Sequence, residues 1–152
     1  MGNTDNSAYP LSFYFKVEFF IGPDRPELAF REVSGLAVEL DMEKIEGGEN
    51  GLEYRLPTRI KYANIICKRS LAPLEQGVLS DWIKSSFDFR ERIRPCPILV
   101  SLMDAQGNKL AAWSVTNAYP VKWEISHPDA GENELAIETL EFAYTKIERR
   151  EQ

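Results

Sequence analysis

The sequence predicts a mainly β fold, a single-domain β-barrel or sandwich with one flanking α-helix and a long projecting β-hairpin. About seven segments alternate apolar and polar residues with the period of two that is typical of half-buried strands. Only one segment has helical spacing, and the glycine- and proline-rich residues 46–69 belong to arms that are too long for a small domain. The chain is one domain, 1–152, in which residues 1–10 and 149–152 are expected to be flexible or ordered by partners.

Composition and charge exclude several classes of protein. With 43% hydrophobic and 28% charged residues, the chain has the composition of an ordinary globular protein. No apolar run approaches the ~20 residues that cross a bilayer, and the first residues lack the pattern of a signal peptide, so we expect no membrane span and cytoplasmic synthesis. The net charge of −6, with no basic cluster beyond residues 90–94, argues against specific nucleic-acid binding.

The first strands follow from apolar alternation. Residues 11–21 alternate over their whole length and predict a half-buried strand, which the turn sequence GPDRP ends. A short strand to about Val33 comes next, followed by a break at Ser34 and Gly35 and by a second strand that begins at Leu36. Gly35 is expected to mark a bulge or a kink.

The next segment predicts an unusually long hairpin. Its arms are residues 36–46 and 52–68, joined by the turn sequence EGGENG and interrupted by Pro57. At about 3.3 Å per residue such arms cover roughly 36 to 56 Å, whereas a typical strand covers about 17 to 20 Å. Residues 41–64 are therefore expected to project beyond the rest of the domain, with edges available for pairing.

One helix and several strands complete the chain. The residues that recur at helical spacing are Leu74, Val78, Leu79, Trp82, Ile83 and Phe87, and Pro73 suits the first turn of that helix. Alternation then predicts strands at residues 97–104, 109–116, 119–126 and 135–148. A change of apolar phase within the last of these strands predicts a bulge.

No residues have the pattern of a catalytic, cofactor or metal site. His127, the single histidine, lies among turn residues, where a surface histidine is a better interpretation than a general base. Ser34 lacks the sequence context of a nucleophile, and EGGENG lacks the Lys and Ser/Thr of a phosphate-binding loop. Cys67 and Cys96 lie in apolar surroundings, which favours buried free thiols over a disulfide or a zinc site. We expect no enzyme activity, no cofactor and no metal.

A row of carboxylates alternates along one face of a predicted strand. Its members are Glu39, Asp41 and Glu43, with Glu46 further along the chain. Alternate spacing on an exposed strand is typical of a solvated face or of one that lines a channel, and it favours such a stripe over a catalytic carboxylate pair. The stripe is therefore expected to face solvent or a channel.

The three tryptophans are interpreted as packing residues. Trp82 lies on the apolar face of the predicted helix and Trp123 on the apolar face of a predicted strand, so both are expected in the core. Trp113 belongs to a strand that is apolar on both faces. Such a strand lies in the centre of a sheet or is covered by another subunit.

The return arm of the hairpin is apolar on both faces, so both faces need to be covered. A monomer covers one of them with its helix, and a ring of identical subunits covers the other when each hairpin adds to its neighbour's sheet. The residues predicted to form this subunit interface are Glu46, Gly47, Gly48, Gly51, Leu56, Pro57, Tyr62, Ile65 and Ile66. The glycines permit the turn, and Tyr62, Ile65 and Ile66 are expected to carry the apolar contact.

Several quoted stretches together resemble a known family. The succession FREVSGL, EGGEN, KYANIICKRS, LSDWI, VSLMDAQGN, WSVTNAYPVKW and LAIETLEFAYTKI, within residues 11–148, resembles the tail tube proteins of contractile-tailed phages and of phage-like contractile injection systems such as antifeeding prophage and virulence cassette particles. Each motif alone is weak, and their combination is moderately specific. Ser70 departs from the glycine that commonly follows the Lys-Arg pair in that family.

The resemblance implies a structural subunit that closes into a hexameric ring, with the hairpin reaching adjacent subunits. Stacked rings form the inner tube of a phage tail or an extracellular particle made in the bacterial cytoplasm, and cargo passes along the lumen. The resemblance further implies that the acidic stripe of Glu39, Asp41 and Glu43 faces the lumen or a neighbouring ring. Other tube proteins, the spike, the baseplate and the sheath are the implied partners. Main tube protein and tube initiator both remain open. The alternatives are a tube protein of a type VI secretion system and, from another class, a small-molecule-binding β-barrel or hydrolase.

Overall fold

The computed structural model describes residues 13–47, 51–88, 92–126 and 136–151. Expectations for residues 1–10, Gly48 and His127 fall outside these ranges. Within them the elements are β1 (Tyr14–Phe19), β2 (Glu27–Phe30), β3 (Glu32–Ser34), β4 (Val38–Glu46), β5 (Glu53–Tyr62), β6 (Ile65–Ser70), α1 (Val78–Ser86), β7 (Cys96–Met103), β8 (Lys109–Ser126), β9 (Ile137–Ala143) and β10 (Lys146–Arg150). The predicted mainly β fold with one helix is confirmed.

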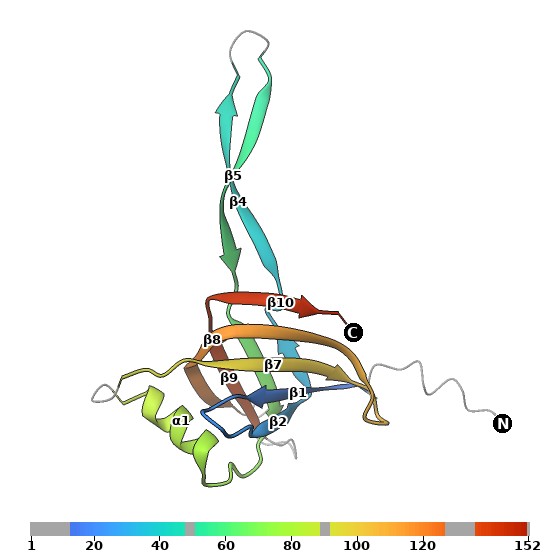
Figure 1. Ribbon diagram of the computed structural model, residues 1–152, viewed down its shortest axis with the longest axis vertical. Helices are drawn as coiled ribbons and strands as arrows, with labels where there is room; N and C mark the ends of the chain where they lie inside the picture. Colours follow the sequence, from blue (N-terminus) through green and yellow to red (C-terminus); the bar gives the residue numbers. More distant parts are fainter. Residues whose placement is uncertain (1–12, 48–50, 89–91, 127–135, 152) are drawn as a thin grey trace, which may run out of the picture.

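All strands except β4 and β5 belong to one sheet that folds over at β8. The strand order is β2-β1-β7-β8-β9-β6-β3, and β10 also pairs with β8. The first part of β8 pairs with β7 and β10, whereas residues 119–126 pair with β9. One layer therefore contains β2, β1, β7 and β10, and the other contains β9, β6 and β3, with β8 shared (Figure 1). The fold is the predicted sandwich, and β2 and β3 do not pair to close it into a barrel.

Aromatic side chains fill the space between the layers and α1. Phe19 of β1 lies 5.7 Å from both Trp82 of α1 and Phe142 of β9, measured between ring centroids. Trp82 and Phe142 stack at 6.3 Å. Large buried rings dominate the energetics of a core, and this cluster joins both layers to the helix. The predicted core position of Trp82 is confirmed.

The helix begins later than the sequence pattern indicates. It starts at Val78, after Gly77, whose φ of 152° is not helical. Pro73 therefore lies outside the helix, and Leu74 packs against the core from the preceding loop. Leu79, with Trp82 and Ile83, forms the buried face of α1.

The last three strands differ from the predicted ones in their boundaries. The two strands expected at residues 109–116 and 119–126 are the single strand β8, which bends where Asn117 has a φ of 55°. The single last strand with a bulge is instead two strands, β9 and β10, which pair with opposite ends of β8. Arg149 and Arg150 pair with β8 as part of β10, within the segment 149–152 that was expected to be flexible or ordered by partners.

The remaining tryptophans and the cysteines have clear positions. Trp113 lies on the part of β8 between β7 and β10, which is the predicted central strand. Trp123 is 38% exposed, so its predicted core position is wrong, because it lies on the part of β8 that, among the described strands, pairs with β9 on one side and has an open edge on the other. Cys67 and Cys96 are buried free thiols, as predicted.

Candidate assembly surface

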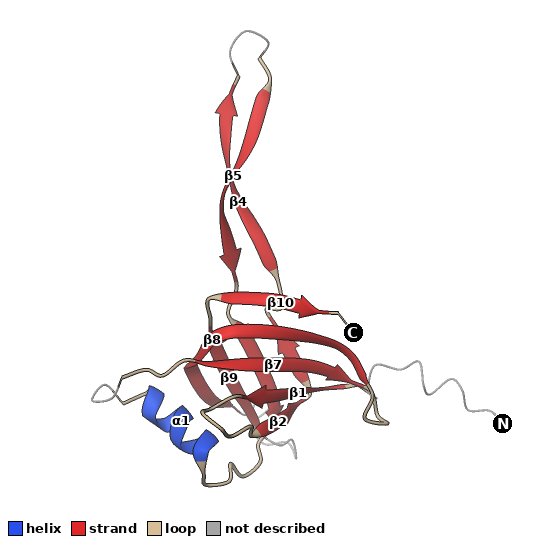
Figure 2. Cartoon of the chain, viewed as in Figure 1, coloured by secondary structure: helices blue, strands red, loops and turns tan. Residues whose placement is uncertain are grey.

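The hairpin of β4 and β5 projects from the sandwich as a separate two-stranded sheet (Figures 1 and 2). Its paired residues run from Val38 with Tyr62 at the base to Glu46 with Glu53 at the tip. The return arm leaves the hairpin after Tyr62, since Ile65 already pairs with Phe142 in the main sheet. The hairpin is therefore shorter than the predicted arm to residue 68.

The placement of Ile65 and Ile66 follows from this boundary. Both residues lie in β6, not in the hairpin. Ile65 is fully buried in the core of its own chain, and Ile66 is half-buried. Ile65 therefore cannot carry the predicted contact with a neighbouring subunit, because β9 and the core already cover it.

Three contacts hold the root of the hairpin against the sandwich. Gly35 has a φ of 90°, and a Cβ atom at this position would overlap the carbonyl oxygen of Asn64. The Asn64 side-chain amide donates a hydrogen bond of 2.8 Å to the carboxylate of Glu141 on β9. The ring of Tyr62 packs on Tyr144 at 5.6 Å between centroids. The direction of the hairpin is thus set by contacts at both of its strands.

The half of the hairpin next to the sandwich, from the pair Val38–Tyr62 to the pair Met42–Pro57, is called the base half. Directly paired residues share a face, and successive residues along a strand lie on opposite faces. One face of the base half is therefore apolar, and it consists of Val38, Leu40, Met42, Pro57, Ile60 and Tyr62. Leu40 and Ile60 are 53% and 54% exposed, so this face is uncovered in the single chain.

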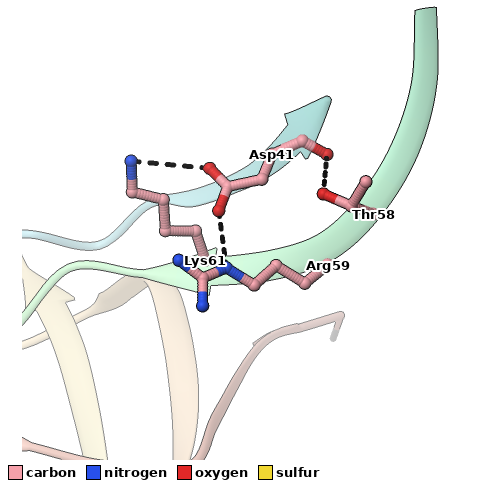
Figure 3. A network of polar contacts seen from close by, with 4 residues as sticks. All are labelled: Asp41, Thr58, Arg59 and Lys61. Carbon is pink, nitrogen blue, oxygen red and sulfur yellow. Dashed lines mark hydrogen bonds and ion pairs between the residues drawn. The ribbon is translucent and has the colours of Figure 1, made fainter. Parts of the chain in front are cut away.

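The opposite face of the base half carries a polar network around Asp41 (Figure 3). Arg59 donates from Nε to the Asp41 carboxylate at 2.6 Å, and the Lys61 ammonium lies 3.6 Å from the same carboxylate. The Thr58 hydroxyl donates to the Asp41 carbonyl oxygen at 3.1 Å. The hydrogen bond from Arg59, supported by Lys61, lowers the pKa of Asp41, and Asp41 in turn raises the pKa of Arg59.

This network changes the interpretation of the predicted acidic stripe. Glu39 and Asp41 share their face with basic residues of the facing strand, since Glu39 pairs with Lys61 and Asp41 pairs with Arg59. The face therefore has mixed charge. The sequence did not indicate these pairs, because strand register is set by hydrogen bonds between segments that are distant in sequence.

The outer half, from the pair Glu43–Leu56 to the pair Glu46–Glu53, is called the tip half, and its pattern is reversed. The face that is apolar in the base half here carries Lys44, Glu46, Glu53 and Arg55. Lys44 and Glu53 form an ion pair at 3.9 Å. The other face carries Ile45, Tyr54 and Leu56, which are between 42% and 55% exposed.

Glycine is required on both sides of the turn at the tip. The Gly47 amide donates to the Leu52 carbonyl at 2.7 Å. A Cβ at Gly47 would lie 2.6 Å from that carbonyl oxygen and 2.6 Å from the ring of Tyr54. Gly51 has a φ of 65°, a conformation that glycine adopts without strain. The predicted role of Gly47 and Gly51 in the turn agrees with this geometry.

The second layer of the sandwich ends in two strands with unpaired edges. Within the described ranges, β3 pairs only with β6, and residues 119–126 of β8 pair only with β9. The second of these edges carries Val121, Trp123 and Ile125, which are exposed. An unpaired edge with exposed apolar residues is suited to pairing with another chain.

Away from the hairpin, a buried ion pair joins two strands of the second layer. Arg69 of β6 and Glu138 of β9 form an ion pair at 2.7 Å, and Trp123 donates to the other Glu138 oxygen at 2.6 Å. Burial raises the pKa of the Cys96 thiol to about 11 and also raises that of Cys67, so both remain protonated at neutral pH. Across the described ranges, no three His, Cys, Asp or Glu residues are arranged to hold a metal ion.

Comparison with known proteins identifies the family. The model of the family described as T4-like virus tail tube protein gp19 matches residues 11–148. The chain belongs to this tail tube protein family. No curated protein sequence matches the chain. Members of the family are structural tube proteins, and the described residues include no helix of the length and hydropathy needed to span a membrane.

Solved structures share the tail tube fold. A chain of the anti-feeding prophage baseplate matches with a TM-score of 0.74 and 24% identity, covering 99% of this chain and 97% of that one. A chain of the sheath-tube complex of PVC, an extracellular contractile injection system, matches with a TM-score of 0.69 and 24% identity, covering 99% of both. Hcp1 from Salmonella typhimurium matches with a TM-score of 0.54 and 11% identity, covering 91% of this chain and 85% of that one. At these identities the likeness concerns the fold.

Proposed function

We propose that this tail tube family member assembles with copies of itself into hexameric rings that stack into the inner tube of a contractile injection system. It acts as a structural subunit without catalytic activity, and cargo passes through the ring. The observation that carries the proposal is the projecting hairpin, whose apolar residues are about half exposed in the single chain. A two-stranded ribbon is at best marginally stable alone in water, so such a hairpin needs a partner.

The open edges of the second layer support ring formation. In a ring, β3 of one subunit and residues 119–126 of β8 of the next can continue one sheet around the lumen, which leaves no exposed edge in the second layer. This arrangement is heterologous, because different surfaces of each subunit meet, and it closes when the rotation per subunit divides a full turn.

Among the related assemblies, an extracellular injection particle is favoured over a type VI secretion system. The TM-scores of 0.74 and 0.69 belong to baseplate and sheath-tube chains of such particles, against 0.54 for the Hcp1 chain. On this proposal the protein is made in the bacterial cytoplasm and then joins the particle next to other tube proteins, the sheath, the baseplate or the spike. The aromatic cluster fills the core, which argues against a ligand-binding barrel.

Electron microscopy of the purified protein tests this proposal. At concentrations up to about 1 mM, we expect rings with sixfold symmetry or stacked tubes, or, for a tube initiator, binding to purified spike, baseplate or sheath proteins. The absence of both rings and partner binding would overturn the proposal. Replacing residues 45–58 by a two-residue turn is expected to leave a folded monomer that forms no rings. Normal polymerisation of that variant would remove the hairpin from the assembly mechanism.

A further inference from the structure

The exposed apolar residues change from one face of the hairpin to the other halfway along it. On β4 the change falls between Met42 and Ile45, which are three positions apart and therefore lie on opposite faces. On β5 the apolar residues Leu56 and Ile60 are four positions apart and would share a face in a regular strand. The register shift between Asp41 and Met42 leaves Thr58 as an extra residue on β5, which moves Leu56 to the face of Ile45.

The twist of the ribbon reverses the direction of each face over the same distance. Figure 1 shows β4 and β5 exchanging sides between the base and the tip, with the crossing at mid-height. Two-stranded ribbons twist more strongly than larger sheets, and strands that exchange sides in this way belong to a ribbon that has turned over between base and tip. A face that points to one side of the molecule at the base therefore points to the opposite side at the tip.

The change of face and the turning over of the ribbon cancel each other. We propose that the apolar residues of both halves form one continuous side of the hairpin, the apolar side, which docks along a single surface of a second copy of this chain. Its members are Val38, Leu40, Met42, Pro57 and Ile60 of the base half with Ile45, Tyr54 and Leu56 of the tip half. Without the register shift, Tyr54 and Leu56 of β5 would not share the face of Ile45 of β4, and the apolar residues of the tip half would be divided between two sides of the hairpin.

A second copy is the occupant on the proposed function, on which this step rests, and the charges of the hairpin fit that occupant. Two copies that each carry a net charge of −6 repel, so their contact requires a surface without uncompensated carboxylates. Asp41 and Glu53 lie on the opposite side of the hairpin, where Arg59 and Lys44 of the same chain pair with them. Glu43 is the exception among these carboxylates. It pairs with Leu56 next to the crossing point and therefore lies on the apolar side.

Thiol labelling tests which side is covered. The native Cys67 and Cys96 are buried, so an introduced surface cysteine is the reactive thiol. The variants Leu40→Cys and Tyr54→Cys report on the apolar side of the base and tip halves. Their matched controls are the adjacent positions on the opposite side, Glu39→Cys and Arg55→Cys. Each variant is assembled with an excess of wild-type protein and treated with a maleimide, next to the same variant as a dilute monomer.

Assembly is expected to slow labelling at positions 40 and 54 by at least about tenfold and at positions 39 and 55 by less than about twofold, since core residues of an interface are excluded from water. Protection at positions 40 and 55 instead would show that the covered surface stays on one face of the sheet from base to tip. That result would overturn the proposal. A wild-type protein that stays monomeric at about 1 mM but binds a tube, sheath or spike protein would overturn the second copy as occupant while the proposed function stands.

Discussion

The ring of Tyr62 packs against the ring of Tyr144 at 5.6 Å between centroids and an angle of 59°. Tyr62 ends β5, and Tyr144 lies in the corner between β9 and β10. The contact thus joins the root of the projecting hairpin to the corner where the chain passes from β9 to β10. Together with the hydrogen bond from Asn64 to Glu141, it transmits the orientation of the sandwich to the hairpin.

Removing the Tyr144 ring is expected to destabilise the root. Tyr144→Ala is predicted to lower the free energy of unfolding by about 1 to 2 kcal/mol, because it removes an aromatic pair and part of the buried area. Tyr144→Phe keeps the ring, and it removes a buried hydroxyl that has no hydrogen-bond partner among the described residues. We therefore expect Tyr144→Phe to be neutral or stabilising by up to about 1 kcal/mol in urea denaturation. Equal losses for both variants would contradict this role of the ring.

Gly35 is expected to tolerate no side chain. Gly35→Ala combines a positive φ with an overlap between Cβ and the Asn64 carbonyl oxygen, so we predict a loss of about 2 to 4 kcal/mol. The matched control is Gly107→Ala, which has a similar φ of 85° but no atom within 4 Å of the new Cβ. The control is expected to cost about 1 kcal/mol from backbone strain alone. Similar losses in thermal unfolding would show that the close approach to Asn64 is unimportant.

Removing one partner of the ion pair between Arg69 and Glu138 is expected to destabilise the protein more than removing both charges. The two side chains are 12% and 3% exposed, so Arg69→Met leaves a buried carboxylate with Trp123 as its remaining partner. We predict a loss of about 3 to 5 kcal/mol for that variant. The double variant Arg69→Met with Glu138→Gln removes the charge as well and is expected to recover most of the loss. A double variant as unstable as the single one would refute the explanation by charge burial.

The Asp41 network gives a pH dependence with a definite sign. Because Arg59 lowers the pKa of Asp41 in the folded state, the stabilisation from this pair is present at neutral pH and is lost as the pH falls through that lowered pKa. Carbon NMR titration of the Asp41 carboxyl group is expected to show the lowered pKa in the wild-type protein. In Arg59→Gln the pKa is expected to rise toward the ordinary value, with Arg55→Gln as the control that leaves it unchanged. An unchanged titration in Arg59→Gln would contradict the pairing.

Much of the fold and the existence of the hairpin follow from local patterns in the sequence. Apolar alternation predicted β1 and the strands that follow the helix, because strand periodicity is visible within a few residues. The chemistry of EGGENG predicted the turn, and Gly35 predicted a bulge or a kink before the hairpin, since positive φ values favour glycine. The apolar surroundings of Cys67 and Cys96 predicted their burial in the same way.

The tertiary structure alone decided where the hairpin ends, what its charges contact and which way its apolar residues point. Ile65 belongs to the core because β6 pairs with β9, and Asp41 is neutralised because the register places Arg59 opposite it. Such relationships depend on hydrogen bonds between distant strands, on one extra residue at Thr58 and on the twist of the ribbon. Periodicity within a strand specifies which residues share a face, but only register and twist specify where that face points.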